Sequence, residues 1–232
     1  MAKKSRTPPP PRRVQVPKTR TTPRSDAEAR KLLPYMAALS ALGIIGLALT
    51  IFLISRGGSS DRPSPVDFST LPGLQTEAPP WNTGLAGLDD RLAPLNLPQL
   101  ANEGQVVHIH QHLDLSVNGR KVKVPAGVGI QEGSYITTLH THDDTGLIHV
   151  ESPVKRNYSL GEFFGVWGVR LDKNCIADLC DNTTGNGVKM WVNGKRYVGN
   201  PADLELKSHQ QIVVVFGKPP AKIPTYVFPP NT

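Results

Sequence analysis

Six of the chain's seven histidines lie in two short stretches, and both stretches space them for metal chemistry. "HIHQH" carries His108, His110 and His112, and "LHTHDDTGLIHVES" carries His140, His142 and His149. A neutral imidazole is a common ligand for zinc, copper, nickel and iron. Alternate residues of a β-strand point to the same side, so each H-x-H pair would present two rings on one face. The spacing therefore predicts a metal site built on strands.

The first stretch lies in a segment with the pattern of a half-buried strand. "VVHIHQHLDLSVNGRKVKV" alternates apolar and polar residues, and its Asn118–Gly119 pair is typical of a tight hairpin turn. One predicted face is apolar: Val107, Ile109, Leu113, Leu115 and Val117. The other is polar and carries the histidines: His108, His110, His112, Asp114 and Ser116.

The second stretch is a predicted hairpin in which "ITTLHTH" and "LIHVES" flank the loop Asp143–Gly146. Closure at that loop would pair the residues as follows: His142 with Leu147, His140 with His149, and Thr138 with Glu151. Directly opposed residues of an antiparallel pair have β-carbons about 5 Å apart and point to the same side. We therefore expect His140, His142, His149 and Glu151 to form one cluster. A register slip of one residue would destroy it.

The candidate ligands come from both segments. The predicted metal ligands are His108, His110, His140, His142 and His149. His112 and Glu151 are candidate extra ligands or hydrogen-bond partners that orient a ligand, although a rise of about 3.3 Å per residue would place His112 about 13 Å from His108. Asp143 is a candidate oxygen ligand too, but with Asp144 it suits a turn better.

The donor set favours a zinc or copper(II) ion as cofactor. Zinc catalytic sites commonly use three protein ligands and one open position. Neither cysteine nor methionine adjoins the histidines, which argues against a blue-copper site or a dedicated copper(I) carrier. Two other interpretations remain: histidines that only hydrogen-bond on a polar strand face, and histidines that sense protons.

The elements after the second hairpin indicate an α+β, mostly β fold. "SLGEFFGVWG" predicts a helix over 160–168 with Ser159 and Glu162 at capping-box spacing. A hairpin turning at Asn193–Gly194 and a strand over 211–216 follow. This order, carried by "SLGEFF…VKMWVNGK…LELKSHQQIVVVFG", resembles a transcobalamin-like β-grasp domain. The resemblance implies a β-grasp-like fold over 105–217, with an extra N-terminal hairpin, and implies no cobalamin site.

The stretch from Leu32 to Ser55 contains no charged residue and predicts one transmembrane helix. Its length of about 36 Å would cross a hydrocarbon core of about 30 Å. Residues 1–31 hold ten Lys/Arg and two Asp/Glu of the chain's 26 and 19, leaving 16 basic and 17 acidic residues beyond them. This places the N-terminus in the cytoplasm by the positive-inside rule and argues against a nucleic-acid-binding domain. A cleaved signal peptide is the rival interpretation.

The predicted organisation has five parts. They are a disordered basic arm (1–31), the transmembrane helix (32–55), a Pro/Gly-rich spacer (56–104), the exported His-rich domain (105–217) and a Pro-rich tail (218–232). Within the domain, Cys175 and Cys180 form a C-x4-C pair that predicts a local disulfide, with metal ligation as the alternative.

A wider set of motifs, "PPW…HxHxHL…VNG…VPAGVGI…LHTHDDTGLIHVESP…SLGEFFGVWGV", resembles a family of bacterial membrane-anchored proteins. The resemblance spans most of residues 79–217 and implies a single-pass protein of the bacterial cell membrane with an extracytoplasmic domain, but no particular activity. We expect a metal-binding module that senses, buffers or delivers metal, with other membrane or exported proteins as possible partners. A metal-dependent hydrolase or lyase and a nonmetal pH-responsive interaction domain are the alternatives; the sequence has no nucleophile elbow and no P-loop.

Overall fold

The computed structural model describes residues 66–181, 183 and 187–230. The predicted arm (1–31), the predicted membrane helix (32–55) and the first ten residues of the predicted spacer lie outside the described residues. Within the described part of the chain, no helix is long and apolar enough to cross a membrane.

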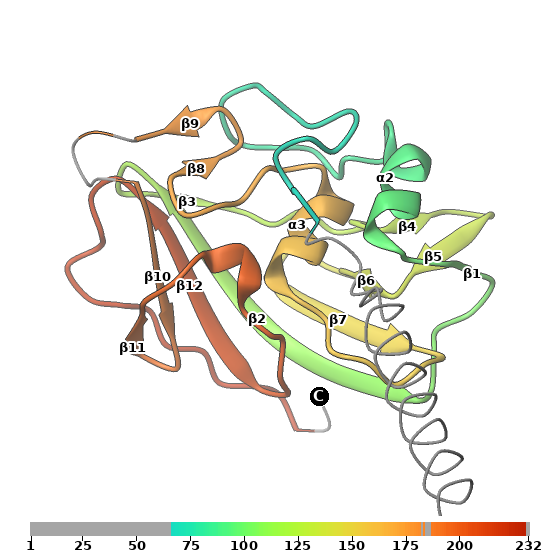
Figure 1. The fold of residues 1–232 in the computed structure, drawn as a ribbon. Coiled ribbons are helices and arrows are strands. Elements are labelled where there is room, and N and C mark those ends of the chain that lie inside the picture. Colours follow the sequence, from blue (N-terminus) through green and yellow to red (C-terminus); the bar gives the residue numbers. More distant parts are fainter. Residues whose placement is uncertain (1–65, 182, 184–186, 231–232) are drawn as a thin grey trace, which may run out of the picture. The chain divides into compact units, whose positions relative to one another are not determined.

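The largest element is a seven-stranded sheet (Figure 1). Its strands are β2 (Val107–Val117), β3 (Arg120–Val122), β6 (Leu139–His140), β7 (Leu147–Ser152), β10 (Val188–Val192), β11 (Lys195–Tyr197) and β12 (Gln210–Phe216). The order is β11-β10-β12-β2-β7-β6, with β3 also paired to β2. Only β12 and β2 run parallel; the other neighbours are antiparallel. The prediction of an α+β, mostly β fold is confirmed.

The strand that carries the first histidines is central to this sheet. We expected the hairpin turning at Asn118–Gly119 to be an addition to the domain, and the turn itself is confirmed by pairing of β2 with β3. However, β2 pairs with β12 on one side and with β7 on the other. Its length of 11 residues and its buried apolar face suit this central place.

Two small sheets and three helical segments complete the described fold. One small sheet has the order β1 (Gln99–Leu100), β5 (Tyr135–Thr137), β4 (Ile130–Gln131). The other pairs β8 (Cys175–Ile176) with β9 (Leu179–Cys180), and the disulfide between Cys175 and Cys180 joins its two strands, as predicted. The helical segments are α2 (Leu88–Leu95), α3 (Leu160–Trp167) and the 3-10 turn η1 (Pro201–Asp203).

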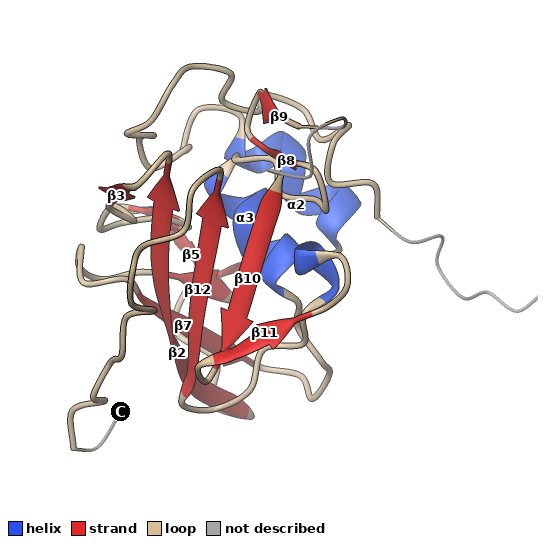
Figure 2. Ribbon diagram, turned by 90° about the vertical axis from the view of Figure 1, so that its left-hand side faces the viewer, coloured by secondary structure: helices blue, strands red, loops and turns tan. Residues whose placement is uncertain are grey.

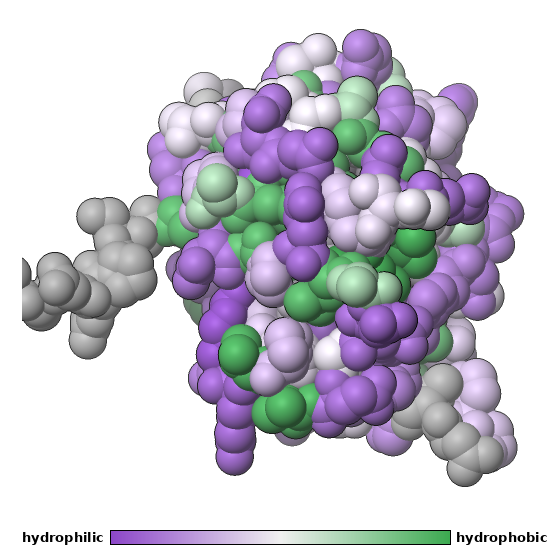
Figure 3. Space-filling model, turned by 90° about the vertical axis from the view of Figure 1, so that its right-hand side faces the viewer, coloured by the Kyte–Doolittle hydropathy of each residue, from purple (hydrophilic) through white to green (hydrophobic). Residues whose placement is uncertain are grey.

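Helix α3 forms the hydrophobic core with one face of the large sheet (Figure 2). It begins at the predicted capping box, in which the Ser159 hydroxyl accepts from the Glu162 amide and the Glu162 carboxylate accepts from the Ser159 amide. Its apolar residues Leu160, Phe163, Phe164 and Trp167 are fully buried. On the surface, by contrast, Figure 3 shows apolar residues in separate patches between hydrophilic ones.

The segment before β2 is part of the same core. The compact unit includes the described residues from Val66 onward, whereas the predicted domain began at Gln105. Trp81 packs edge-on against Trp167 with ring centroids 5.9 Å apart, and α2 buries Leu88, Leu92 and Leu95. The segment predicted as a Pro/Gly-rich spacer (56–104) therefore contributes to the core from one short helix and the chain around it.

Arg91 fastens this N-terminal segment to α3. Its side chain is completely buried and donates hydrogen bonds to the backbone carbonyls of Gly165 (2.8 Å), Val166 (3.1 Å) and Gly73 (3.1 Å), and also to that of Gly84. The first two carbonyls lie at the negative end of the α3 dipole, where a cation is favoured. One guanidinium thus satisfies acceptors from segments far apart in the sequence.

We expect Arg91→Met to lower the free energy of unfolding by about 3–5 kcal/mol, because it leaves several buried carbonyls without donors. Denaturant unfolding measures this change. The matched control is Arg120→Met at an exposed position, which should change stability by less than about 0.5 kcal/mol. Equal, small effects of both substitutions would contradict the role given to Arg91.

Candidate metal centre

The sheet aligns three histidines in one row across β2, β7 and β6. His110 of β2 pairs with His149 of β7, and His149 pairs with His140 of β6. In the next row, His108 pairs with Glu151, whose amide donates to the carbonyl of Thr138 (2.8 Å). Paired residues point to the same side of a sheet. The predicted pairing of His140 with His149 is confirmed. Strand β2 adds His108 and His110 to the cluster.

The row beside these histidines is apolar and points to the other side. Ile109, Val150 and Leu139 are paired across the same three strands and belong to the core around α3. The histidines therefore occupy the sheet face opposite α3. The apolar row fixes which set of side chains faces the core.

Two H-x-H pairs converge within this cluster. The Nε2 atoms of His108 and His110 are 3.2 Å apart, and those of His140 and His142 are 3.1 Å apart. The ring of His149 lies between the pairs, with its centroid 4.4 Å from that of His110 and 4.5 Å from that of His142.

The potential ligands form two overlapping groups, each with its ligand atoms within 4.8 Å of one another. The first group is His108, His110, His149 and Glu151, and the second is His140, His142, His149 and Glu151. The fold thus brings together all five histidines predicted as ligands, together with Glu151. These groups could hold a metal ion. The assignment of each of these five histidines as a metal ligand stays a prediction.

His140 is oriented by a hydrogen bond on the far side of its ring. Its Nδ1 lies 2.9 Å from the carbonyl oxygen of Thr137. A carbonyl only accepts, so in the neutral ring Nδ1 carries the proton and Nε2 keeps its lone pair. That lone pair is on the atom facing His142. Metal-bound histidines are commonly held by such a bond to a backbone carbonyl.

Glu151 supplies a buried carboxylate to both groups. Its Oε1 is 3.0 Å from Nδ1 of His149 and 3.3 Å from Nε2 of His108. Its Oε2 is buried and has no hydrogen-bond partner among the described residues. Burial, followed by the nearby carboxylate of Glu103, raises the pKa of Glu151 to about 7. A cation at this position would compensate both effects.

Burial also keeps the central imidazoles in the neutral form that binds metal. It lowers the pKa of His140 to about 4 and that of His149 to about 3, and the neighbouring histidines add to the second shift. The pKa of His110 is lowered for the same reasons. Protons therefore compete weakly for these rings at neutral pH.

Glu103 is a cluster residue that the sequence did not reveal. Its Oε1 lies 3.3 Å from Nε2 of His142, and its side chain is 43% exposed. The following residue, Gly104, packs so closely on β7 that a β-carbon there would lie 2.1 Å from the carbonyl carbon of Ser152. In the sequence, only the glycine at position 104 indicates that this loop packs closely on β7, because the loop has no periodic pattern.

The remaining sequence candidates lie outside both groups. His112 is buried, with Nε2 3.0 Å from the carbonyl oxygen of Thr145 and its ring stacked on Tyr226 of the Pro-rich tail. Asp143 accepts from the Thr145 amide, as suits a turn, and Asp144 pairs with Lys123.

The end of the second hairpin also differs from prediction. We expected His142 to pair with Leu147, but the β6–β7 ladder ends at His140 and His149. The next residue, Thr141, instead bonds through its amide to the carbonyl of Val128. His142 therefore reaches the cluster from beyond the ladder.

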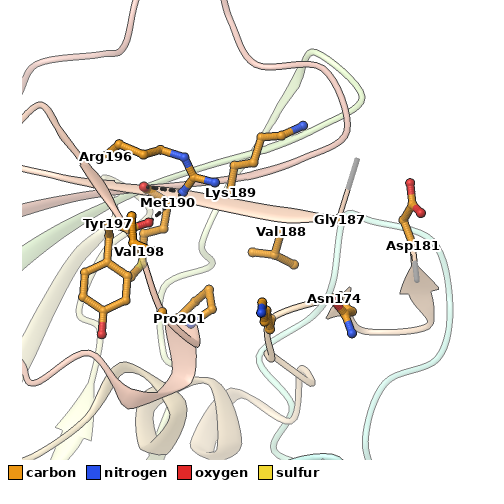
Figure 4. Close-up of a pocket in the computed structure, with 12 residues that line it drawn as sticks. Asn174, Asp181, Gly187, Val188, Lys189, Met190, Arg196, Tyr197, Val198 and Pro201 are labelled. Atoms are coloured by element: carbon orange, nitrogen blue, oxygen red, sulfur yellow. Dashed lines mark hydrogen bonds between the residues drawn. The ribbon is translucent and has the colours of Figure 1, made fainter. Parts of the chain in front are cut away.

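The cluster is accessible at His108 and at His142, whose side chains are 47% and 43% exposed. His142 also lines a hollow of about 590 Å³ with Thr83, Leu85, Ala126, Gly127, Ile130, Gln131 and Glu132. A separate hollow of about 270 Å³ lies beside β10 and β11 and is lined by Lys173, Lys189 and Arg196 among others (Figure 4). No histidine lines this hollow, so it does not offer the imidazole ligands found in the cluster.

Comparisons of the chain with protein-family models, with curated proteins and with solved structures give no match.

We expect His140 and His149 to remain neutral at pH 5 in the metal-free protein. Both pKa values are lowered, so the stability linked to these rings is present above the ordinary value of 6.5 and is lost as the pH falls from 6.5 toward 4 and 3. The raised pKa of Glu151 acts oppositely: its contribution is present below 4.5 and is lost as the pH rises toward 7.

NMR spectra of the imidazole nitrogens, recorded after chelation of metal, would report the charge of each ring directly. The same rings in urea-unfolded protein should titrate near the ordinary histidine pKa of about 6.5. Protonation of either ring in the folded protein at pH 5.5 would contradict the expected desolvation.

Proposed function

We propose that this chain is a metal-binding protein whose histidine cluster holds zinc or copper(II). The observation that carries the proposal is the convergence of five imidazoles and a buried carboxylate from β2, β7, β6 and the residues that follow β6. Nitrogen and oxygen donors of this kind suit both ions.

The spacing of the ring nitrogens matches that of two ligands of one ion, although it also suits a hydrogen bond between the rings. Two nitrogens at 2.0–2.1 Å from one tetrahedral zinc ion are about 3.3 Å apart. The two H-x-H pairs have Nε2 separations of 3.2 and 3.1 Å. In addition, the buried Oε2 of Glu151, which has no hydrogen-bond partner among the described residues, offers an acceptor to a cation.

Proton sensing by the central histidines is less well supported, although Glu151, whose pKa burial raises to about 7, changes charge near neutral pH. A sensor operating between pH 5 and 7 needs a group that changes charge in that range. Burial places the pKa of His140 at about 4 and that of His149 at about 3. The two most central rings would therefore stay neutral throughout that range.

The proposed setting is the bacterial cell membrane, with the domain outside the cytoplasm. The uncharged stretch 32–55 and the ten basic residues before it support an anchor with the N-terminus inside. The disulfide between Cys175 and Cys180 is typical of proteins in oxidising compartments. A tethered module there would sense, buffer or deliver metal, with membrane or exported proteins as partners and no nucleic acid.

A β-grasp assignment of the domain is part of this proposal. The succession β2, β7, α3, β10–β11 and β12 supports it, since it has two strands, a helix, a hairpin and a last strand. The first two strands differ from those expected, because β2 takes the place of the first strand of the second predicted hairpin (136–142). Fold analogy of this kind does not indicate an activity.

A metal-dependent hydrolase or lyase is the second candidate, and the hollow beside His142 favours it. Catalysis would require an open coordination position and room for a substrate. The hollow of about 590 Å³ provides room at the His142 end of the cluster. Glu103, 3.3 Å from His142, could accept a proton there.

Metal analysis of the full-length chain, expressed without a histidine tag, tests the proposal. A fragment beginning near residue 100 would lack Trp81, Arg91 and α2, which belong to the core, so the whole chain is used. We expect bound zinc or copper after dialysis, and a loss of at least tenfold in affinity in His140→Gln, which removes an oriented ligand.

The matched control is His209→Asn, at an exposed histidine outside both ligand groups. It should retain wild-type affinity, and circular dichroism should show that both variants are folded. The proposal is rejected if the folded wild-type chain binds neither zinc nor copper(II) with a dissociation constant in the micromolar range or lower.

A further inference from the structure

We infer that the cluster holds two metal ions rather than one, with Glu151 bridging them. This inference rests on the proposed metal-binding function and goes beyond it in the number of ions and in the division of ligands. Five imidazoles and two carboxylates, those of Glu151 and Glu103, gather in the cluster. A tetrahedral zinc ion takes four ligands, so one ion would leave buried donors unused.

The donors divide into two sets by the strands that carry them. His108 and His110 belong to β2, whereas His140 lies on β6 and His142 just beyond it. Strands β2 and β6 lie on opposite sides of β7 in the sheet. Each H-x-H pair converges on its own point, since the close Nε2 contacts of 3.2 and 3.1 Å are within the pairs.

Glu151 lies on the strand between these pairs. Its Oε1 is 3.3 Å from Nε2 of His108 and 4.0 Å from Nε2 of His140. Its second oxygen is buried without a partner among the described residues. A carboxylate has two oxygens and can bind two cations at once, which an imidazole nitrogen cannot. Two-metal sites in proteins hold their ions about 3.5–4 Å apart.

The outer donors complete each set. Glu103 lies 3.3 Å from His142 and so can join the set of His140 and His142. His149 belongs to both groups of ligand atoms and can complete the set of His108 and His110. Two divalent ions and two carboxylates leave a net charge of about +2 at the cluster. The exposed side at His142 would therefore attract an anionic ligand or hydroxide.

The number of ions per chain tests the inference directly. We expect two zinc ions in the full-length protein by mass spectrometry of the metal and by calorimetric titration. His108→Gln/His110→Gln should retain one ion, and His140→Gln/His142→Gln should retain the other. His209→Asn is the control and should retain two. Each variant is checked by circular dichroism, so that a loss of metal is separated from a loss of fold.

Copper(II) provides a second readout that does not depend on the variants. Two copper(II) ions sharing a carboxylate should show a coupled electron paramagnetic resonance spectrum when the sites are filled. We expect Glu151→Gln to abolish this coupling, because an amide lacks the second anionic oxygen. Either double variant, loaded with one copper ion, should give an ordinary uncoupled spectrum.

The possible outcomes distinguish a failure of the two-ion inference from a failure of the proposed metal-binding function. A wild-type chain that binds one ion and shows no coupling overturns the two-ion centre and leaves metal binding standing. A chain that binds no ion overturns both. Two ions that are both lost from each folded double variant would overturn the proposed division between β2 and β6.

Discussion

The register of β7 between β2 and β6 is the constraint on which the candidate site depends. Because side chains alternate along a strand, one register sends His149 and Glu151 to the histidine face and Ile148 and Val150 to the core. A slip of one residue would exchange these sets and bury polar groups against α3. Packing of the apolar row against α3 therefore fixes the positions of the imidazoles, although the apolar side chains take no part in their chemistry.

The same burial gives the cluster its chemical character. Imidazoles removed from water are held neutral, and a carboxylate beside another carboxylate is held against ionisation. Such a cluster has lone pairs but little positive charge of its own. A divalent cation would supply the missing charge, and the proposed metal binding depends on this complementarity.

Local features of the fold could be predicted from the sequence, whereas pairings between distant segments could not. The Asn118–Gly119 turn, the capping box at Ser159 and the disulfide each depend on a few neighbouring residues. The parallel pairing of β2 with β12 joins strands about a hundred residues apart and has no local signal. The contribution of Glu103 is similar, because it follows from the way Gly104 packs on Ser152. Alternation identified the histidines that share a face, but only the sheet order shows that β2 and β6 flank β7.

The buried guanidinium of Arg91 has a kinetic consequence. Its acceptors come from the chain around Gly73 and Gly84 and from the end of α3, so its hydrogen bonds can form only after these segments have docked. Interactions absent from the folding transition state slow unfolding rather than speed folding. If these segments dock after the transition state, the hydrogen bonds of Arg91 add little to the folding rate but lengthen the time before the N-terminal segment opens to proteases.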